Sequence, residues 1–160
     1  MSRMKLSFLS KNLSSNQRGF FLIKSINDYL EKDKSYDIAV FTEEQPGDCI
    51  VPSFSVMQMV EAWGHQGDFV STDLSTACKL LNFPSANSKF FYVWDLEFLR
   101  GFAPINYDLV KKVYLNEDLK LIARCKHHAK IIENNFNRTV SGIVQDFNID
   151  SLLEVMNGCS

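Results

Sequence analysis

The chain has 160 residues, of which 46% are hydrophobic and 22% are charged, and its formal net charge at pH 7 is −2. This length suits one domain with one sizeable core, so we expect a single domain over residues 1–160. The near-neutral charge and the lack of basic runs give no reason to expect nucleic acid as a partner, and no apolar stretch reaches the roughly 18 residues that a membrane span requires.

The first segment of the chain shows no sign of export. Its apolar patch is short and interrupted by polar residues, unlike a signal peptide, so we expect a cytoplasmic protein. The four cysteines show no C-x-x-C spacing, and we expect free thiols rather than disulfides. Within this segment KLSFLS, residues 5–10, predicts a first strand.

A helix follows this strand almost at once. From residue 14 to residue 32 the apolar residues recur at three- and four-residue spacing, which predicts an amphipathic helix. Ser14 and Gln17 fit a capping box at its start. A continuous apolar run then predicts a strand over residues 36–44, and QPGD at 45–48 predicts a turn.

The next apolar segment is ambiguous. Over residues 55–67 the apolar side chains share one helical face, which predicts a helix, although a run this short is also compatible with a strand. After it, residues 68–73 predict a strand and residues 74–84 a helix that ends at a proline. KFFYVWD, residues 89–95, gives the strongest strand prediction in the chain.

Strand and helix continue to alternate to the end of the sequence. The remaining predicted elements are a helix over 107–116, a strand over 119–125, a helix over 126–136, a strand over 139–147 and a helix over 149–156. Several strands are continuous apolar runs, which indicates burial on both faces. We therefore predict an α/β fold, a three-layer sandwich with a mainly parallel, Rossmann-like sheet and helices on both faces.

Polar residues follow each predicted strand. In an open parallel sheet, ligands bind outside the carboxyl ends of the strands, so we expect these residues to line one edge of the domain. The predicted ligand-binding residues in this row are Lys11, Asn12, Thr42, Asp73, Trp94, Glu97, Arg124 and Asp146. Glu43, Asp95 and His127 are candidate general bases.

Three of these residues allow more than one interpretation. If the chain stays extended there, Asp95 and Glu97 face the same side and form a carboxylate pair suited to acid–base or metal chemistry. Alternatively, one acid caps the next helical turn and the other pairs with Arg100. His127 falls in the first turn of a predicted helix, whose N-terminus would lower its pKa, and it either contacts a substrate or is simply solvated.

Nucleotide and metal motifs are missing from the sequence. The turn after the first strand, SKNLSSNQRG, contains neither G-x-G-x-x-G nor G-x-x-x-x-G-K-[ST], and the chain has 7 glycines where average usage gives about eleven. A phosphate could still bind at the helix start near Ser14, aided by Lys11, unless that terminus binds only water. Cys125, His127 and His128 do not offer closed zinc geometry, so we predict no metal and no resident cofactor.

Three stretches together resemble a known family. They are FVSTDLSTACKLL at 69–81, KFFYVWDLEFLRG at 89–101 and LKLIARCKHHAKIIENNFNRTVSGIVQDFNIDSLL at 119–153. Over residues 36–156 the chain is similar to the N-terminal Rossmann-like domain of GT-B type glycosyltransferases. The resemblance implies that this domain holds the acceptor, and that the second domain, which holds the sugar nucleotide in that family, would begin about where this sequence ends.

Two hypotheses of function follow from the residues and from the resemblance. In the first, the chain is a glycosyltransferase-like domain that binds a sugar or sugar nucleotide at the carboxyl ends of its strands and acts with a second domain, a partner polypeptide or a second copy of itself. In the second, it is a Rossmann-like module that binds a ligand or a partner protein without turnover.

Overall fold

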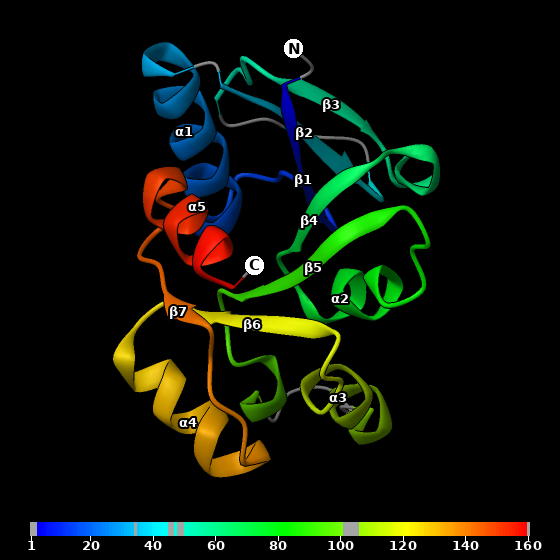
Figure 1. Cartoon of the computed structure of the whole chain (residues 1–160), viewed down its shortest axis with the longest axis vertical. Helices are drawn as coiled ribbons and strands as arrows, with labels where there is room; N and C mark the ends of the chain where they lie inside the picture. The colour runs from blue at the N-terminus through cyan, green and yellow to red at the C-terminus, as the bar shows by residue number, and fades with distance from the viewer. Residues whose placement is uncertain (1–2, 34, 45–46, 48–49, 101–105, 160) are drawn as a thin grey trace.

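The computed structural model describes residues 3–33, 35–44, 47, 50–100 and 106–159 (Figure 1). The strands in these residues are β1 (Met4–Ser10), β2 (Tyr36–Thr42), β3 (Ser55–Gln58), β4 (Gly67–Ser71), β5 (Ala86–Val93), β6 (Leu119–Ala123) and β7 (Gly142–Ile143). The α-helices are α1 (Gln17–Lys32), α2 (Leu74–Leu80), α3 (Tyr107–Tyr114), α4 (Lys126–Phe136) and α5 (Ile149–Gly158), and the 3-10 helices are η1 (Met59–Gly64) and η2 (Glu97–Leu99). Most of the predicted turn over 45–48 lies outside the described residues, as does Cys49.

The strands form one parallel sheet. Across the described residues it has seven strands in the order β3-β2-β1-β4-β5-β6-β7, and every neighbouring pair is parallel. The chain therefore moves outward from β1 in one direction and, after β3, returns to place β4 on the other side of β1. This reversal of strand order is the feature that defines a doubly wound, Rossmann-like sheet.

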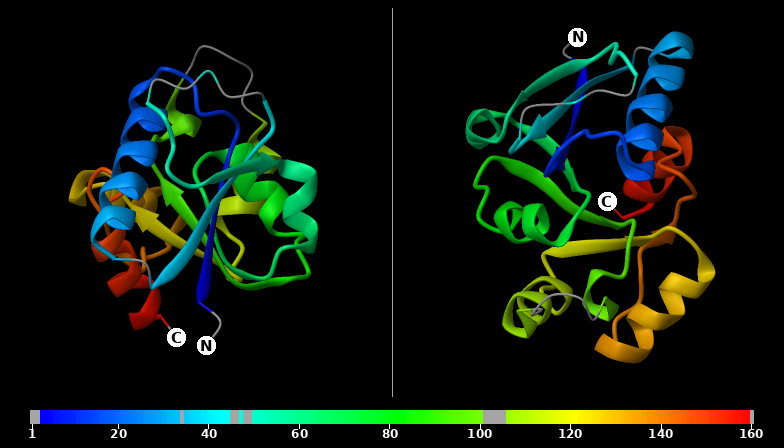
Figure 2. Two further views of the ribbon diagram at one scale, coloured as in Figure 1. Left: turned by 90° about the horizontal axis from the view of Figure 1, so that it is seen from above. Right: turned by 180° about the vertical axis from the view of Figure 1, so that it is seen from behind.

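Helices cover both faces of the sheet, which confirms the predicted three-layer sandwich (Figures 1 and 2). Helices α1 and α5 pack against one face, over strand residues such as Phe8, Val40 and Tyr92. Helices α2, α3 and α4 pack with η1 against the other face, over residues such as Phe41 and Phe91. Because successive strand residues point to opposite faces, the continuous apolar runs in the sequence supply both cores at once.

The described structure differs from the predicted elements in several places. The predicted helix over 55–67 is wrong in its first part, because residues 55–58 form β3 along the open edge of β2. Helix α1 begins at Gln17 with Asn16 as its N-cap, so the predicted capping box at Ser14 is also wrong. Helix α2 ends at Leu80, earlier than the proline that was predicted to end it.

The predicted strand over 139–147 is reduced to the two residues of β7, because the chain bends sharply after it. Asp146 and Phe147 have positive φ angles of 47° and 57°. The Ser25 hydroxyl donates to the Asp146 carbonyl at 2.8 Å, and the Phe147 N–H donates to the Tyr92 hydroxyl at 3.3 Å. These bonds help to hold a backbone conformation that residues other than glycine adopt at a cost, and they direct the chain into α5.

Two expectations from composition can be compared with the structure. Cys78, Cys125 and Cys159 are free thiols, as predicted. None of the helices in the described part of the chain combines the length and the apolar character needed to cross a bilayer.

Candidate functional site at the carboxyl edge of the sheet

The parallel register places the ends of neighbouring strands side by side. Ser10 at the end of β1 is opposite Thr42 at the end of β2, and Val93 at the end of β5 is opposite Ala123 at the end of β6. The polar residues that follow these strands therefore lie along one edge of the sheet, which we call the carboxyl rim. Three groups of the predicted residues occur along this rim.

The first group joins the ends of β1 and β2. The backbone N–H groups of Glu43 and Glu44 both donate to the Lys11 carbonyl, at 3.2 and 3.1 Å. The Asn12 amide donates to a Glu44 carboxylate oxygen at 2.9 Å, and Lys11 Nζ lies 3.8 Å from the other oxygen of Glu44. Lys11 and Asn12 therefore interact with Glu44, which follows β2 at the expected edge but was not among the predicted ligand-binding residues.

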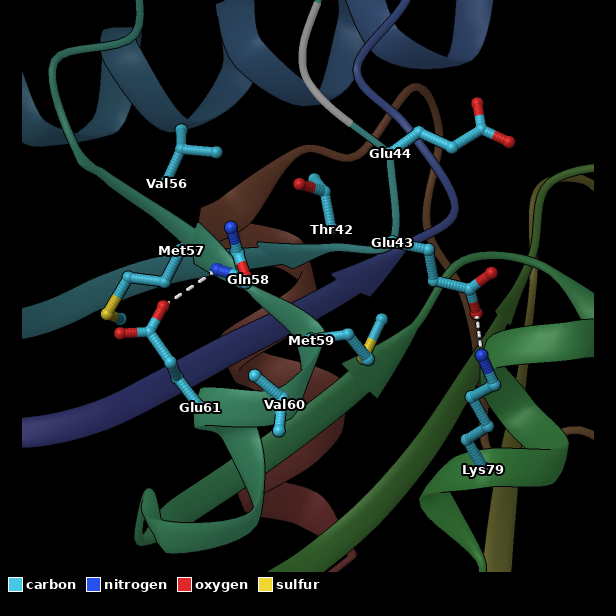
Figure 3. A pocket seen from close by; sticks show the side chains of 10 residues that line it. All are labelled: Thr42, Glu43, Glu44, Val56, Met57, Gln58, Met59, Val60, Glu61 and Lys79. Atoms are coloured by element: carbon cyan, nitrogen blue, oxygen red, sulfur yellow. Dashed lines mark hydrogen bonds and ion pairs between the residues drawn. The ribbon is translucent and has the colours of Figure 1, made fainter.

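A pocket of about 630 Å³ opens beside this group (Figure 3). The end of β2 contributes Thr42 and Glu43, and Glu43 forms an ion pair with Lys79 of α2. The opposite side comes from β3 and η1, and it presents apolar side chains, among them Met57 and Val60, together with the polar Gln58 and Glu61. The pocket thus combines carboxylate and hydroxyl groups with apolar side chains.

The second group lies where the strand order reverses, between β1 and β4. Asp73 is buried and is the N-cap of α2, where its Oδ1 accepts the Thr76 N–H at 2.9 Å. Its Oδ2 accepts the Lys11 N–H at 3.0 Å and lies 3.7 Å from Arg18 Nη1. With both oxygens engaged inside the protein, Asp73 fixes the geometry of the rim, and it offers little to a ligand.

A second pocket, of about 310 Å³, lies next to Asp73 at this reversal of strand order. We call it the switch-point pocket, and its lining residues are Asn16, Gln17, Arg18, Trp94, Asp95, Glu97 and Arg100. Asp95 forms an ion pair with Arg100, as one of the two interpretations of the sequence predicted. Glu97 does not cap its own helical turn. Its Oε2 accepts the Leu74 N–H at 2.8 Å, so it caps the start of α2.

Burial raises the pKa of Glu97 above its usual range, and the carboxylates of Asp73 and Asp95 act in the same direction. The Leu74 N–H and the Arg18 guanidinium oppose this increase. Removing a carboxylate from water penalises its charged form, which is why a half-buried acid of this kind can hold a proton that an exposed acid would lose.

The start of α1, which borders the same pocket, is already capped. The Asn16 side chain accepts the Gly19 N–H at 2.8 Å. A Cβ at Gly19 would lie 2.4 Å from the Ser14 carbonyl oxygen, so only glycine lets the helix approach the preceding turn this closely. If the G-x-G-x-x-G dinucleotide fingerprint is aligned with residues 14–19, Gly19 matches its third glycine, which allows close packing of the helix. Ser14 and Asn16 stand at the positions of the first and second glycines. A phosphate at this terminus would have to displace the Asn16 side chain.

The third group is a stack of side chains at the ends of β5, β6 and β7. Arg124 Nη2 donates to Asp146 Oδ1 at 3.1 Å, and its guanidinium carbon lies 3.7 Å from the centre of the Trp94 ring. The Phe147 ring is stacked on Trp94 with an interplanar angle of 6° and a centroid distance of 5.1 Å. A guanidinium and a parallel ring at these distances cannot share one face, so both faces of Trp94 are covered and only its edge is open to a ligand.

The two histidines of α4 differ in position. His127 is exposed, whereas His128 is half-buried and lines a pocket of about 510 Å³ with Arg124, Cys125 and Asp146. Burial lowers the pKa of His128, and the charges of Arg124 and His127 act in the same direction. The sequence analysis selected His127 because it falls in the first turn of the helix after LIARC, and nothing in the periodicity distinguishes it from His128.

Arg18 and Lys79 were also missed. Arg18 lies in the first turn of α1, directly after the first strand. The tendency of helix N-termini to bind anions could have drawn attention to a basic residue at this position. Lys79 is in the last turn of α2 and reaches the rim only through the fold. Among the described residues, no three His, Cys, Asp or Glu side chains come together in a way that could hold a metal ion.

Comparisons with protein-family models, with curated proteins and with solved structures find no match to this chain.

Proposed function

We propose that the chain is a glycosyltransferase-like domain that binds a sugar or sugar nucleotide at the carboxyl rim and acts together with a second domain or a partner polypeptide. The observation that carries the proposal is the pocket of about 630 Å³ at the ends of β2 and β3. Its carboxylate and hydroxyl groups suit the hydroxyls of a sugar, and its apolar side chains from β3 and η1 suit the flat face of a sugar or a base.

The position of the acids supports this proposal. In doubly wound folds an acidic residue beyond the nucleotide-binding turn accepts hydrogen bonds from the ribose hydroxyls. Glu43 and Glu44 follow β2 and line the large pocket. Glu43 is the candidate general base there, since its ion pair with Lys79 holds the side chain at the edge of the pocket. Asp95 is a second candidate, in the switch-point pocket, and the exposed His127 a third.

Binding measurements on the purified chain test the proposal. UDP-, GDP- and ADP-sugars and free sugars are screened by thermal shift, and any ligand found is measured by calorimetry. A hydrogen bond to a charged group contributes about 1.5–3 kcal/mol, so Glu43→Gln should weaken binding roughly 10- to 100-fold. Glu133→Gln, at an exposed position on α4, is the matched control and should bind like the wild type.

The stability of the unliganded variant must be checked as well. The ion pair between Glu43 and Lys79 is partly exposed, and such pairs contribute about 0–1 kcal/mol, so Glu43→Gln should remain folded. If no sugar or sugar nucleotide binds, or if Glu43→Gln and Glu133→Gln bind equally well, the assignment of this pocket is refuted.

A separate observation favours the non-catalytic alternative, a module that binds a partner protein or forms a homodimer. Val60 and Trp63 of η1 are 70% and 49% exposed, next to the edge strand β3. Exposed large apolar side chains beside a strand edge are typical of protein interfaces. This alternative would be favoured if none of the sugar ligands binds and the chain forms a dimer whose fraction increases with protein concentration.

A further inference from the structure

The switch-point pocket is rich in hydrogen-bond acceptors. The charged and titratable groups around Glu97 come from α1, from the start of α2, from the segment after β5 and from α3. They are Arg18, Asp73, Asp95, Arg100 and Tyr114. When Glu97 is ionised, the described groups of this site comprise three carboxylates and two guanidinium groups, so the site has a net negative charge.

Both guanidinium groups already face a carboxylate. Arg18 lies 3.7 Å from Asp73, and Arg100 forms an ion pair with Asp95. The Asn16 side chain also occupies the N–H group of Gly19 at the start of α1. A phosphate entering the pocket would therefore add negative charge to a site where ionised carboxylates already outnumber guanidinium groups. This charge balance disfavours the phosphate part of a nucleotide at this position, although Arg18 Nε has no hydrogen-bond partner among the described residues.

Glu97 has one oxygen that is held and one that is available. Oε2 accepts the Leu74 N–H at 2.8 Å, which fixes the orientation of the carboxyl group. No described residue donates to Oε1, the other oxygen of a side chain that lines the pocket. A ligand that donates a hydrogen bond to Oε1 would supply the partner that this oxygen lacks inside a partly dehydrated site.

We propose that the switch-point pocket binds an uncharged, hydroxyl-bearing ligand of the sugar class through a hydrogen bond from a ligand hydroxyl to Glu97 Oε1, so that binding is coupled to loss of the proton from Glu97. This inference rests on the proposed function and specifies it further, because it assigns the neutral sugar, rather than phosphate, to this pocket.

The direction of the coupling follows from the chemistry of the carboxyl group. Burial raises the pKa of Glu97, so in the free protein this carboxyl group keeps its proton to a higher pH than an exposed glutamate does. A hydroxyl donor stabilises the ionised form, so ligand binding lowers this pKa and releases a proton. Sugar affinity should therefore increase as the pH rises through the pKa of Glu97.

The test uses the full chain with D-glucose, UDP-glucose and inorganic phosphate as probes. Affinities are measured by calorimetry at several pH values between 5 and 8, and the side-chain carboxyl resonances are followed by NMR. For the wild type we expect sugar affinity to rise about fivefold over this range, the difference between a hydrogen bond to a neutral and to a charged acceptor. Phosphate should leave the Glu97 resonance unchanged.

Glu97→Gln is the decisive variant, because an amide oxygen can still accept the Leu74 N–H while the group no longer titrates. Its sugar affinity should be weaker at pH 8 and independent of pH, whereas Glu133→Gln should keep the wild-type profile. A circular dichroism spectrum like that of the wild type, and a melting temperature no lower than that of the wild type, show that Glu97→Gln remains folded.

The outcomes separate this inference from the proposed function. If sugars bind and are lost in Glu43→Gln, but Glu97→Gln keeps the full pH dependence, the inference is wrong and the proposed function stands. If phosphate shifts the Glu97 resonance and sugars do not, the inference is wrong about the ligand class. If neither sugar probe binds at any pH, the inference fails together with the proposed function.

Discussion

Replacing Gly19 by alanine tests how closely α1 must approach the rim. The added Cβ would lie 2.4 Å from the Ser14 carbonyl oxygen and 3.2 Å from the Leu13 carbonyl carbon. Overpacking a dense site costs about 1–3 kcal/mol, and alanine recovers about 1 kcal/mol over glycine within a helix. Because the obstructing atoms belong to the backbone and cannot rotate away, we expect the upper part of the cost and a net loss of about 2 kcal/mol.

Urea unfolding and thermal melting measure this loss, which corresponds to about 4–8 °C in the melting temperature of a domain of this size. Gly158→Ala is the matched control, since no atom lies within 4 Å of the added Cβ there, and it should be as stable as the wild type or slightly more stable. If Gly19→Ala were as stable as Gly158→Ala, the close contact between α1 and its preceding turn would be refuted, and with it the position of Arg18 in the switch-point pocket.

The remaining predictions concern the core and the titration of one acid. Phe147→Ala should cost about 3–5 kcal/mol in urea unfolding, because the ring is fully buried and stacks on Tyr92 at 4.2 Å; a loss below 1 kcal/mol would contradict the stack. Gly67→Ala should cost about 2–4 kcal/mol, because its φ is +130° and its Cβ would meet the Lys5 carbonyl oxygen at 2.5 Å; near-wild-type stability would mean that the backbone there is not constrained. The raised pKa of Glu97 favours the folded state below the usual pKa of a glutamate, and this contribution is lost as the pH rises through the folded-state value. Glu97→Gln should therefore gain stability relative to the wild type between pH 4 and pH 8, and a difference that stays constant with pH would rule out the raised pKa.

Most of the fold could be predicted from the sequence because its signals are local. The apolar runs of β2 and β5 and the helical periodicity of α1 are each visible within a single segment. For residues 55–58 the strand was the alternative to the favoured helix. The four residues of β3 are defined by pairing with β2, from Ala39↔Ser55 onward, and hydrophobic periodicity does not report a partner that lies elsewhere in the chain.

The candidate site was less predictable, for a related reason. The position of polar residues after each strand follows from the sequence once a parallel sheet is assumed, but their interactions do not. Lys79 of α2 forms an ion pair with Glu43, which follows β2. Glu97 accepts the N–H group of Leu74, 23 residues earlier in the chain, and so caps the start of α2. Trp94 was expected to contact a ligand, yet the stacking of Arg124 and Phe147 on its two faces depends on three separate strands meeting at one edge.

The pairing of α1 with α5 constrains the order in which the chain can fold. These helices lie side by side and cover the same face of the sheet, although α1 is synthesised well before α5. Until residues 144–156 are synthesised, part of the apolar surface of α1 and of the central strands is open to water. Nascent chains shortened before this point should bind chaperones or aggregate, because the bend at Asp146 and Phe147 that leads into α5 is then missing.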